Sequence, residues 1–192
     1  MNKYPKSFCF NRSKIKAIVL GADPSNKSNR GNRVKLDYVF GIGSGDARYF
    51  NPILANIQMI GLSLSDVYVQ NLVQDYLPDV TSENKDWEKM AEKWLPVLQR
   101  DLDNIDKHKK IPVLATAERI FNFLTGEKIS VEEIYRNDKS DNYTIPISPQ
   151  LNRLGRPLVP FYRHKKYSLL DKKNENYLNK LKKIFPVQRI FG

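Results

Sequence analysis

The chain has one cysteine, Cys9, and two histidines, His108 and His164, among its 192 residues. A single cysteine cannot form a disulfide within the chain and excludes a zinc site built from cysteines. Two histidines are too few for a histidine-rich metal site, and the setting DKHKK around His108 is typical of a solvated surface. We therefore expect a protein that works without a metal or another cofactor.

Long apolar runs are also missing. No segment approaches the length of a membrane span, and the first ten residues, MNKYPKSFCF, lack the apolar core of a secretory signal. The sequence has no Walker loop and no GxSxG elbow, and its GIGSGD run lacks the spacing of a dinucleotide-binding fingerprint. We expect a cytoplasmic protein, associated with the nucleoid if it is bacterial, with no membrane partner.

Acidic residues are outnumbered by basic ones. The chain carries 32 Lys and Arg against 21 Asp and Glu, a net charge of +11. Such an excess favours a polyanionic partner, chiefly nucleic acid, through phosphate contacts and counterion release. The alternative is a surface of solvated lysines without such a partner.

The length and the balanced composition are typical of one globular domain with a sizeable core. We assign this domain to residues 1–192, with a basic, irregular lead-in over 1–16 and a tail over 186–192. We expect the protein to be a monomer.

Short apolar runs alternate with patterns of helical spacing. The predicted strands are 17–20, 67–69, 111–116 and 143–146, and the predicted helices are 51–60, 87–102 with an interruption at Pro96, 117–124 and 174–185. Strands that alternate with helices favour parallel pairing. The predicted fold is a three-layer α/β/α sandwich around a short, mainly parallel, four-stranded sheet.

The stretch AIVLGADPSN, residues 17–26, places a carboxylate directly after a buried strand. Pro24 has no backbone N–H and keeps Asp23 out of the helical region, which fixes Asp23 just beyond the strand. Ligands of parallel sheets bind at the carboxyl ends of the strands. Asp23 is thus either a turn former or a chemical group.

Two further residues have the chemistry to bind a planar ligand. Phe40, before Gly41, is either a core aromatic or a platform for stacking. Asn71 follows the predicted strand 67–69, and its amide offers donors and an acceptor. This amide could satisfy a neighbouring turn or read the edge of a base.

The order of these segments resembles the uracil-DNA glycosylase superfamily, most closely its classic uracil-excising branch. GADPSN (21–26) is similar to the family's water-activating G-Q-D-P-Y-H loop, and VFGIG (39–43) to the segment whose Phe stacks on the flipped base. VYVQNLV (67–73) resembles the strand that ends in the base-reading Asn. ISPQLNR (147–153) takes the place of the H-P-S-P-L loop, and FYRHKKYS (161–168) resembles the closing segment.

The resemblance implies a role for each matching residue in excising a base from DNA. Asp23 would position water and stabilise positive charge on the sugar, Phe40 would stack on the base, and Asn71 would bind its edge. Ala22 and Ser25 would line the base pocket. The implied DNA-binding residues are Ser148, which would hold a phosphate, Leu151 or Gln150 as the wedge in the base stack, and Pro149 and Arg153 beside them. For Leu151, the alternative is that it caps the core.

The sequence departs from the family pattern at three positions. Pro146 stands where the family has the His that donates a hydrogen bond to the uracil oxygen, and loss of such a donor costs roughly 10²–10³ in rate. His164 does not replace it in our interpretation, because its surroundings match the structural closing segment. Ser25 replaces the Tyr that excludes thymine, and Ala22 replaces Gln, so a base other than uracil could fit.

The sequence therefore predicts a metal-free DNA glycosylase acting on uracil or another damaged base, in single- or double-stranded DNA. The alternative is a protein of the same fold, catalytically weak or inactive, that binds DNA or senses bases.

Overall fold

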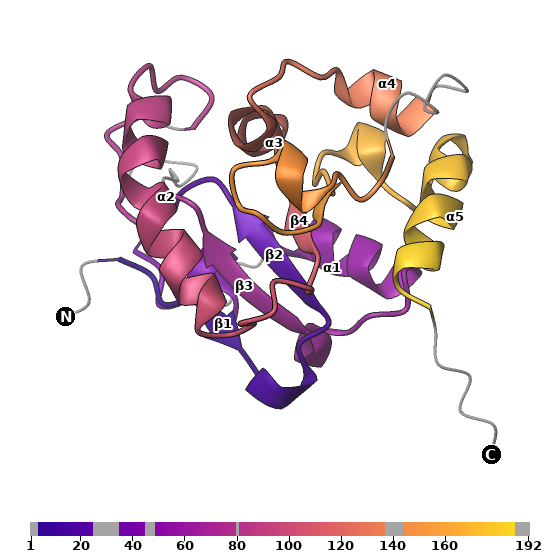
Figure 1. Ribbon diagram of the computed structural model, residues 1–192, viewed down its shortest axis with the longest axis horizontal. Helices are drawn as coiled ribbons and strands as arrows, with labels where there is room; N and C mark the ends of the chain where they lie inside the picture. The colour runs from indigo at the N-terminus through magenta and orange to yellow at the C-terminus, as the bar shows by residue number, and fades with distance from the viewer. Residues whose placement is uncertain (1–3, 25–34, 45–48, 80, 137–143, 187–192) are drawn as a thin grey trace.

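The computed structural model describes residues 4–24, 35–44, 49–79, 81–136 and 144–186 (Figure 1). It is an α/β fold built on a five-stranded sheet with the strand order β1-β3-β2-β4-β5. The strands are β1 Phe8–Cys9, β2 Ala17–Gly21, β3 Val67–Asn71, β4 Val113–Ala115 and β5 Leu158–Pro160. The helices are α1 Asn51–Met59, α2 Trp87–Asp103, α3 Glu118–Thr125, α4 Val131–Arg136 and α5 Glu175–Ile184.

The four longer strands form a parallel sheet, and a fifth, antiparallel strand adds to it. Strand β2 pairs in parallel with β3 and β4, and β4 pairs in parallel with β5. Gly21 lies opposite Asn71, and Leu20 lies opposite Ala115, so the carboxyl ends of the three central strands meet at one edge. The two-residue β1 pairs antiparallel with β3, within the stretch that we expected to be an irregular lead-in. The prediction of four strands is thus wrong by one edge strand.

The last parallel strand lies later in the chain than predicted. Of the expected strand 143–146, residues 144–146 are described and form no strand, whereas Leu158–Pro160 form β5. Pro146 cannot donate a ladder hydrogen bond. Only Ile147 pairs, in one antiparallel bridge in which Ile147 N and Leu158 O lie 2.8 Å apart.

Burial of the sheet shows that both of its faces are covered. Every residue of β2, β3, β4 and β5 is buried, and successive side chains of a strand point to opposite faces. Figure 1 shows α2 and α5 on opposite sides of the central strands. Helix α2 runs unbroken through Pro96, where we expected an interruption. Among the described residues, no helix combines the length and apolar character that crossing a membrane requires.

A buried arginine joins the end of α2 to the start of β5. The Arg156 side chain is 1% exposed, and its Nη1 lies 2.7 Å from Asp106 Oδ2 while its Nη2 lies 2.8 Å from Asp103 Oδ1. The Asp106 carboxylate also accepts a hydrogen bond from Ile111 N at 2.8 Å. Because buried charges cost free energy unless they are paired, this cluster fixes the edge of the sheet only while its carboxylates are ionised.

We expect the Asp106→Asn variant to lose about 1.5–3 kcal/mol of the free energy of unfolding at pH 7. Burial would raise the pKa of Asp106, but the hydrogen bond from Ile111 N–H and the Arg156 charge outweigh it and lower that pKa. This stabilisation is complete above the ordinary pKa of about 3.9 and is lost as the pH falls through the lowered folded value. Urea unfolding at pH 7 and pH 3 measures it. A difference from the unmodified protein that does not shrink with acid would contradict the charge-based explanation.

Candidate functional site

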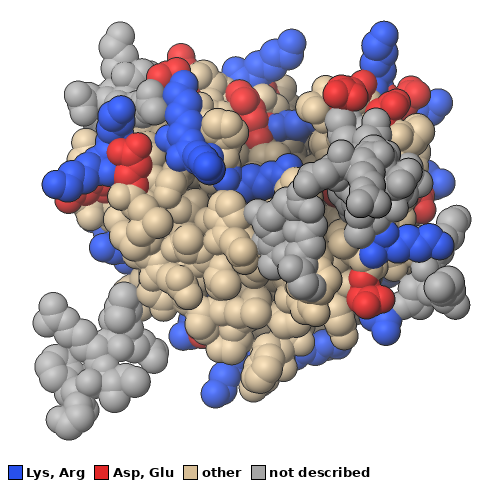
Figure 2. All heavy atoms as spheres, turned by 180° about the vertical axis from the view of Figure 1, so that it is seen from behind, with Lys and Arg blue, Asp and Glu red and all other residues tan. Residues whose placement is uncertain are grey.

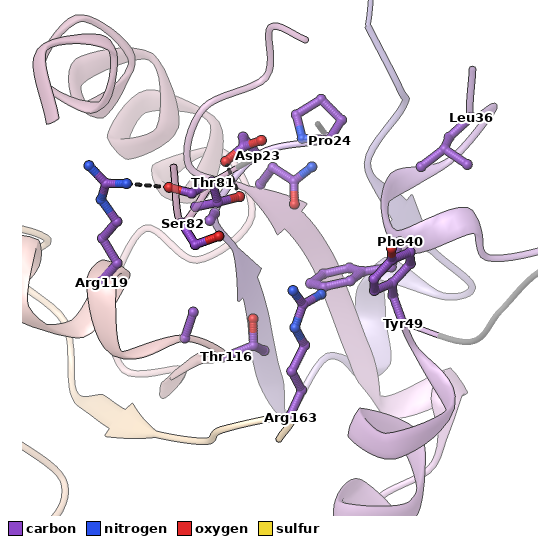
Figure 3. A pocket seen from close by; sticks show the side chains of 13 residues that line it. Asp23, Pro24, Leu36, Phe40, Tyr49, Thr81, Ser82, Thr116, Arg119 and Arg163 are labelled. Carbon is purple, nitrogen blue, oxygen red and sulfur yellow. Dashed lines mark hydrogen bonds between the residues drawn. The ribbon is translucent and has the colours of Figure 1, made fainter. Parts of the chain in front are cut away.

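A cavity of about 300 Å³ lies at the edge where the carboxyl ends of the central strands meet (Figure 3). Ala22 and Asp23 reach it from the end of β2, and Asn71 reaches it from the end of β3. Thr116 and Ala117 follow β4 and also line it. The cavity is therefore at the position where parallel sheets bind their ligands.

Two donors from the described part of the chain hold the Asp23 carboxylate. Its Oδ2 accepts a hydrogen bond from Thr81 Oγ1 at 2.6 Å and another from Trp87 Nε1 at 3.0 Å. Trp87 is fully buried at the start of α2, so the indole cannot move without disturbing the core. Asp23 itself is half-buried at the cavity wall. The carboxylate is thus oriented before any ligand binds.

Arg119 on α3 holds the segment that supplies these donors. Its guanidinium donates to the carbonyl oxygen of Thr81 and, at 2.8 Å, to that of Asn84. It also forms a two-pronged pair with the Glu88 carboxylate at 2.7 and 2.6 Å, which lowers the pKa of Glu88. The guanidinium lies 5.1 Å from the centre of the Trp87 ring. Arg119 therefore acts on the site through Thr81 and Trp87.

Gly21 lets two candidate ligand-binding side chains meet. A Cβ atom placed on Gly21 would lie 2.2 Å from Asn71 Oδ1 and 2.6 Å from Phe40 Cζ. Both distances are far below a van der Waals contact, so any side chain at residue 21 would displace the amide or the ring. The absence of a side chain there allows the Phe40 ring and the Asn71 amide to pack over the end of β2.

The backbone of Phe40 is strained. Its φ of 58° and ψ of 8° are in the left-handed region, which costs a residue with a side chain roughly 1–2 kcal/mol. The buried neighbour Val39 and the ring of Phe50, whose centre lies 5.9 Å from that of Phe40, hold it in place. Strain of this kind concentrates at ligand-binding sites. The half-buried Phe40 ring thus lines the cavity although its backbone conformation costs free energy.

The Asn71 amide has no other described residue as a partner. Asn71 is 2% exposed, and its side chain makes no hydrogen bond to any residue within the described ranges. Its amide atoms are not among the fully buried polar atoms that lack a partner in the described residues, so they are accessible from the cavity. Because Asn71 lines the cavity, a group inside the cavity is the natural partner of this amide.

The structure thus brings together four of the residues that the resemblance singled out, namely Ala22, Asp23, Phe40 and Asn71. Ser25, the fifth residue of the predicted base pocket, lies outside the described residues. The roles assigned to these side chains stay predictions, which the geometry permits.

The predicted DNA-binding loop does not line this cavity. Residues 148–153 precede β5 and form their own turn, in which Ser148 Oγ bonds to the Gln150 side chain and Pro149–Leu151 make one turn of 3₁₀ helix. Leu151 is 67% exposed, so the alternative that it caps the core is wrong. DNA contact by Ser148, Pro149, Gln150 and Leu151 stays a prediction.

Arg153 at the end of this loop is already engaged within the protein. Its guanidinium pairs with the Glu92 carboxylate, with Nη1 and Oε1 2.6 Å apart, and lies 4.5 Å from the centre of the Phe123 ring. Its backbone N donates to Leu124 O at 2.8 Å. A phosphate would have to compete with Glu92 for this side chain.

Arg163, which the sequence pattern did not single out, lines the cavity from beyond the carboxyl end of β5. Its backbone N lies 3.4 Å from Thr116 O, and its guanidinium lies 5.1 Å from the centre of the Tyr49 ring. With β5 placed at 158–160, the carboxyl-end rule that singled out Asp23 would have selected this residue as well. The neighbouring His164 caps a short turn through its Nδ1, which accepts from Lys166 N at 3.2 Å, and the structural interpretation of His164 stays a prediction that this contact supports.

Comparison of the chain with protein-family models and with curated proteins gives no match.

Proposed function

We propose that this protein hydrolyses the N-glycosidic bond of uracil or another damaged base flipped out of DNA. The observation that supports it most is the meeting of Asp23, Phe40 and Asn71 in one cavity from three separate segments. The uracil-DNA glycosylase-like, three-layer arrangement of the fold is part of this proposal.

The cavity has the size and the chemistry to hold one base. Its volume of about 300 Å³ is at the lower end of ligand pockets, which suits a small planar ring. The Phe40 ring offers a stacking face, and the Asn71 amide offers donors and an acceptor to the edge of the ring. A base must leave the duplex to enter such a pocket, and enzymes that act on bases pay this unstacking cost.

The proposed reaction uses Asp23 at the sugar. When the bond between C1′ and the ring nitrogen breaks, its electron pair stays on the base and positive charge develops on the sugar. The Asp23 carboxylate stabilises that charge and orients the water whose oxygen bonds to C1′. The water loses one proton, and one proton ends on the base, so the products are the free base and an abasic sugar.

The charge of the protein supports a polyanionic partner without defining where it binds. The net charge is +11, and on the face seen in Figure 2 Lys and Arg side chains lie around the margin, with Asp and Glu among them toward the top. A broad area of uncharged residues lies to the left of the centre of that face and below it. A polyanion would be held by scattered contacts, with affinity that falls as salt is added.

One observation favours the second function, a fold of this type that binds DNA or senses bases with little or no hydrolysis. Neither His108 nor His164 lines the cavity, so no imidazole donates to the departing base. Recognition by Phe40 and Asn71 does not need a donor to the departing base, whereas fast hydrolysis needs a donor of some kind.

Uracil-containing single- and double-stranded oligonucleotides separate the two functions. After incubation with purified protein, alkaline treatment cuts the strand at abasic sites. Strand cutting that requires Asp23 supports the glycosylase. Salt-sensitive binding without cutting, for uracil and for a panel of other modified bases, contradicts the glycosylase and supports the binding protein.

A further inference from the structure

Arg163 gives the cavity a cation that forms no ion pair with any carboxylate of the described residues. Its guanidinium makes no hydrogen bond and no ion pair with any residue in the described parts of the chain. Its described contact is with the face of the Tyr49 ring, 5.1 Å from the ring centre. Figure 3 shows the side chain rising from beside Thr116 toward the rings of Phe40 and Tyr49.

The other arginine of the cavity differs in this respect. The Arg119 guanidinium is occupied by the Glu88 carboxylate and by two backbone carbonyl oxygens. Arg119 therefore stabilises the wall of the cavity, and most of its N–H donors are already used within the protein. Arg163 is thus the cavity's available cation among the residues that line it.

Arg163 stays charged in these surroundings, and its charge interacts with that of the Asp23 carboxylate. Arg163 is an exposed residue, but the atoms packed around its guanidinium remove part of its hydration and lower its pKa, while the fields of Tyr49 and Asp23 act to raise it. A guanidinium holds its proton far more strongly than any other side chain, so the group stays a cation at physiological pH. The cavity therefore presents a positive group and a carboxylate to the same ligand.

We propose that Arg163 binds the departing base as an anion and takes the place of the missing imidazole donor. This inference rests on the proposed function. As the bond between sugar and base breaks, the base carries the electron pair and becomes negative while the sugar becomes positive. Arg163 faces the negative product and Asp23 the positive one, so the cavity matches the charge separation of the transition state.

The first test measures binding of free rings. Barbiturate is a pyrimidine ring that is an anion at neutral pH, and uracil is a neutral ring of similar size. We expect the unmodified protein to bind barbiturate about tenfold tighter than uracil, and Arg163→Gln to lose this preference. Arg100→Gln, an exposed arginine of α2 outside the cavity, is the matched control and should keep it. A preference that survives in Arg163→Gln, or is missing from the unmodified protein, overturns the inference.

The second test measures release of two bases under single-turnover conditions. The 5-fluorouracil anion is more stable than the uracil anion and needs less help to leave. We expect Arg163→Gln to slow uracil release by roughly 10²-fold and 5-fluorouracil release much less, with Arg163→Lys in between. Equal slowing of both bases would show that Arg163 only packs the site, and would overturn the inference.

The two tests keep the inference separate from the proposed function. Base release that depends on Asp23 but not on Arg163 supports the function and overturns the inference. No release of either base, with an Arg163-dependent preference for barbiturate, overturns the function and supports Arg163 as the anion site of a binding protein.

Discussion

The Asp23→Asn variant is expected to release a base roughly 10²–10³ times more slowly than the unmodified protein. The carboxamide has the shape of the carboxylate and keeps an oxygen that can accept from Thr81 and Trp87. What it lacks is the negative charge that stabilises the sugar cation. Single-turnover cleavage of a uracil-containing oligonucleotide measures the loss.

Two further measurements distinguish a loss of catalysis from a loss of DNA binding or of folding. Fluorescence anisotropy should give nearly unchanged DNA affinity, because Asp23 lies in the cavity wall and contributes no attraction to phosphates. Thermal unfolding should show little change, since the substitution is close to isosteric. Asp79→Asn removes the same charge from an exposed position and should cleave normally. Cleavage by Asp23→Asn at the unmodified rate would show that Asp23 is a turn former and nothing more.

The central part of the fold could be predicted because its local signals agree. The apolar run before Gly21 and the one before Asn71 have the length of buried strands, and both form as predicted. The apolar spacing in α2 was strong enough to predict that helix despite Pro96. Pro96 did not break it, because packing of the buried stripe outweighs the loss of one hydrogen bond.

The edges of the sheet could not be predicted from local pattern. Strand β1 has two residues, too few to show any periodicity. Strand β5 contains Pro160 and follows Pro157, and proline argues against a strand except at a sheet edge. Strand β5 lies at that edge, but only the assembled sheet shows it. Because the last strand was predicted at 143–146 and not at 158–160, the carboxyl-end rule pointed to the loop 147–153, and Arg163 beyond β5 was not selected.

The candidate site was predictable only where its residues follow strands that the local pattern identifies. Asp23 and Asn71 follow strands that the pattern identifies, so the carboxyl-end rule selects both. The donors to Asp23 come from Thr81 and Trp87, 58 and 64 residues further along the chain, and no local signal links them. The left-handed backbone of Phe40 likewise depends on what packs around the ring.

Gly21→Ala is expected to lower base release by about 10²-fold while the protein stays folded. The strand backbone accepts alanine, but the new methyl group would lie 2.2 Å from Asn71 Oδ1 and 2.6 Å from Phe40 Cζ. The amide, the ring or both must move by about 1 Å, and misplacement of this size is costly because binding and orientation are lost together. Single-turnover release and binding of free uracil measure both losses.

The matched control separates this displacement from a general loss of stability. Gly126 follows α3 with a φ of 74° and has no atom near the position of a Cβ, so Gly126→Ala adds backbone strain of about 1–2 kcal/mol away from the cavity. This variant should melt earlier yet release base at the unmodified rate. If Gly21→Ala instead keeps full activity, the Asn71 amide and the Phe40 ring do not hold the base. In that case the proposed roles of both residues fail together, because the two side chains share the space above Gly21.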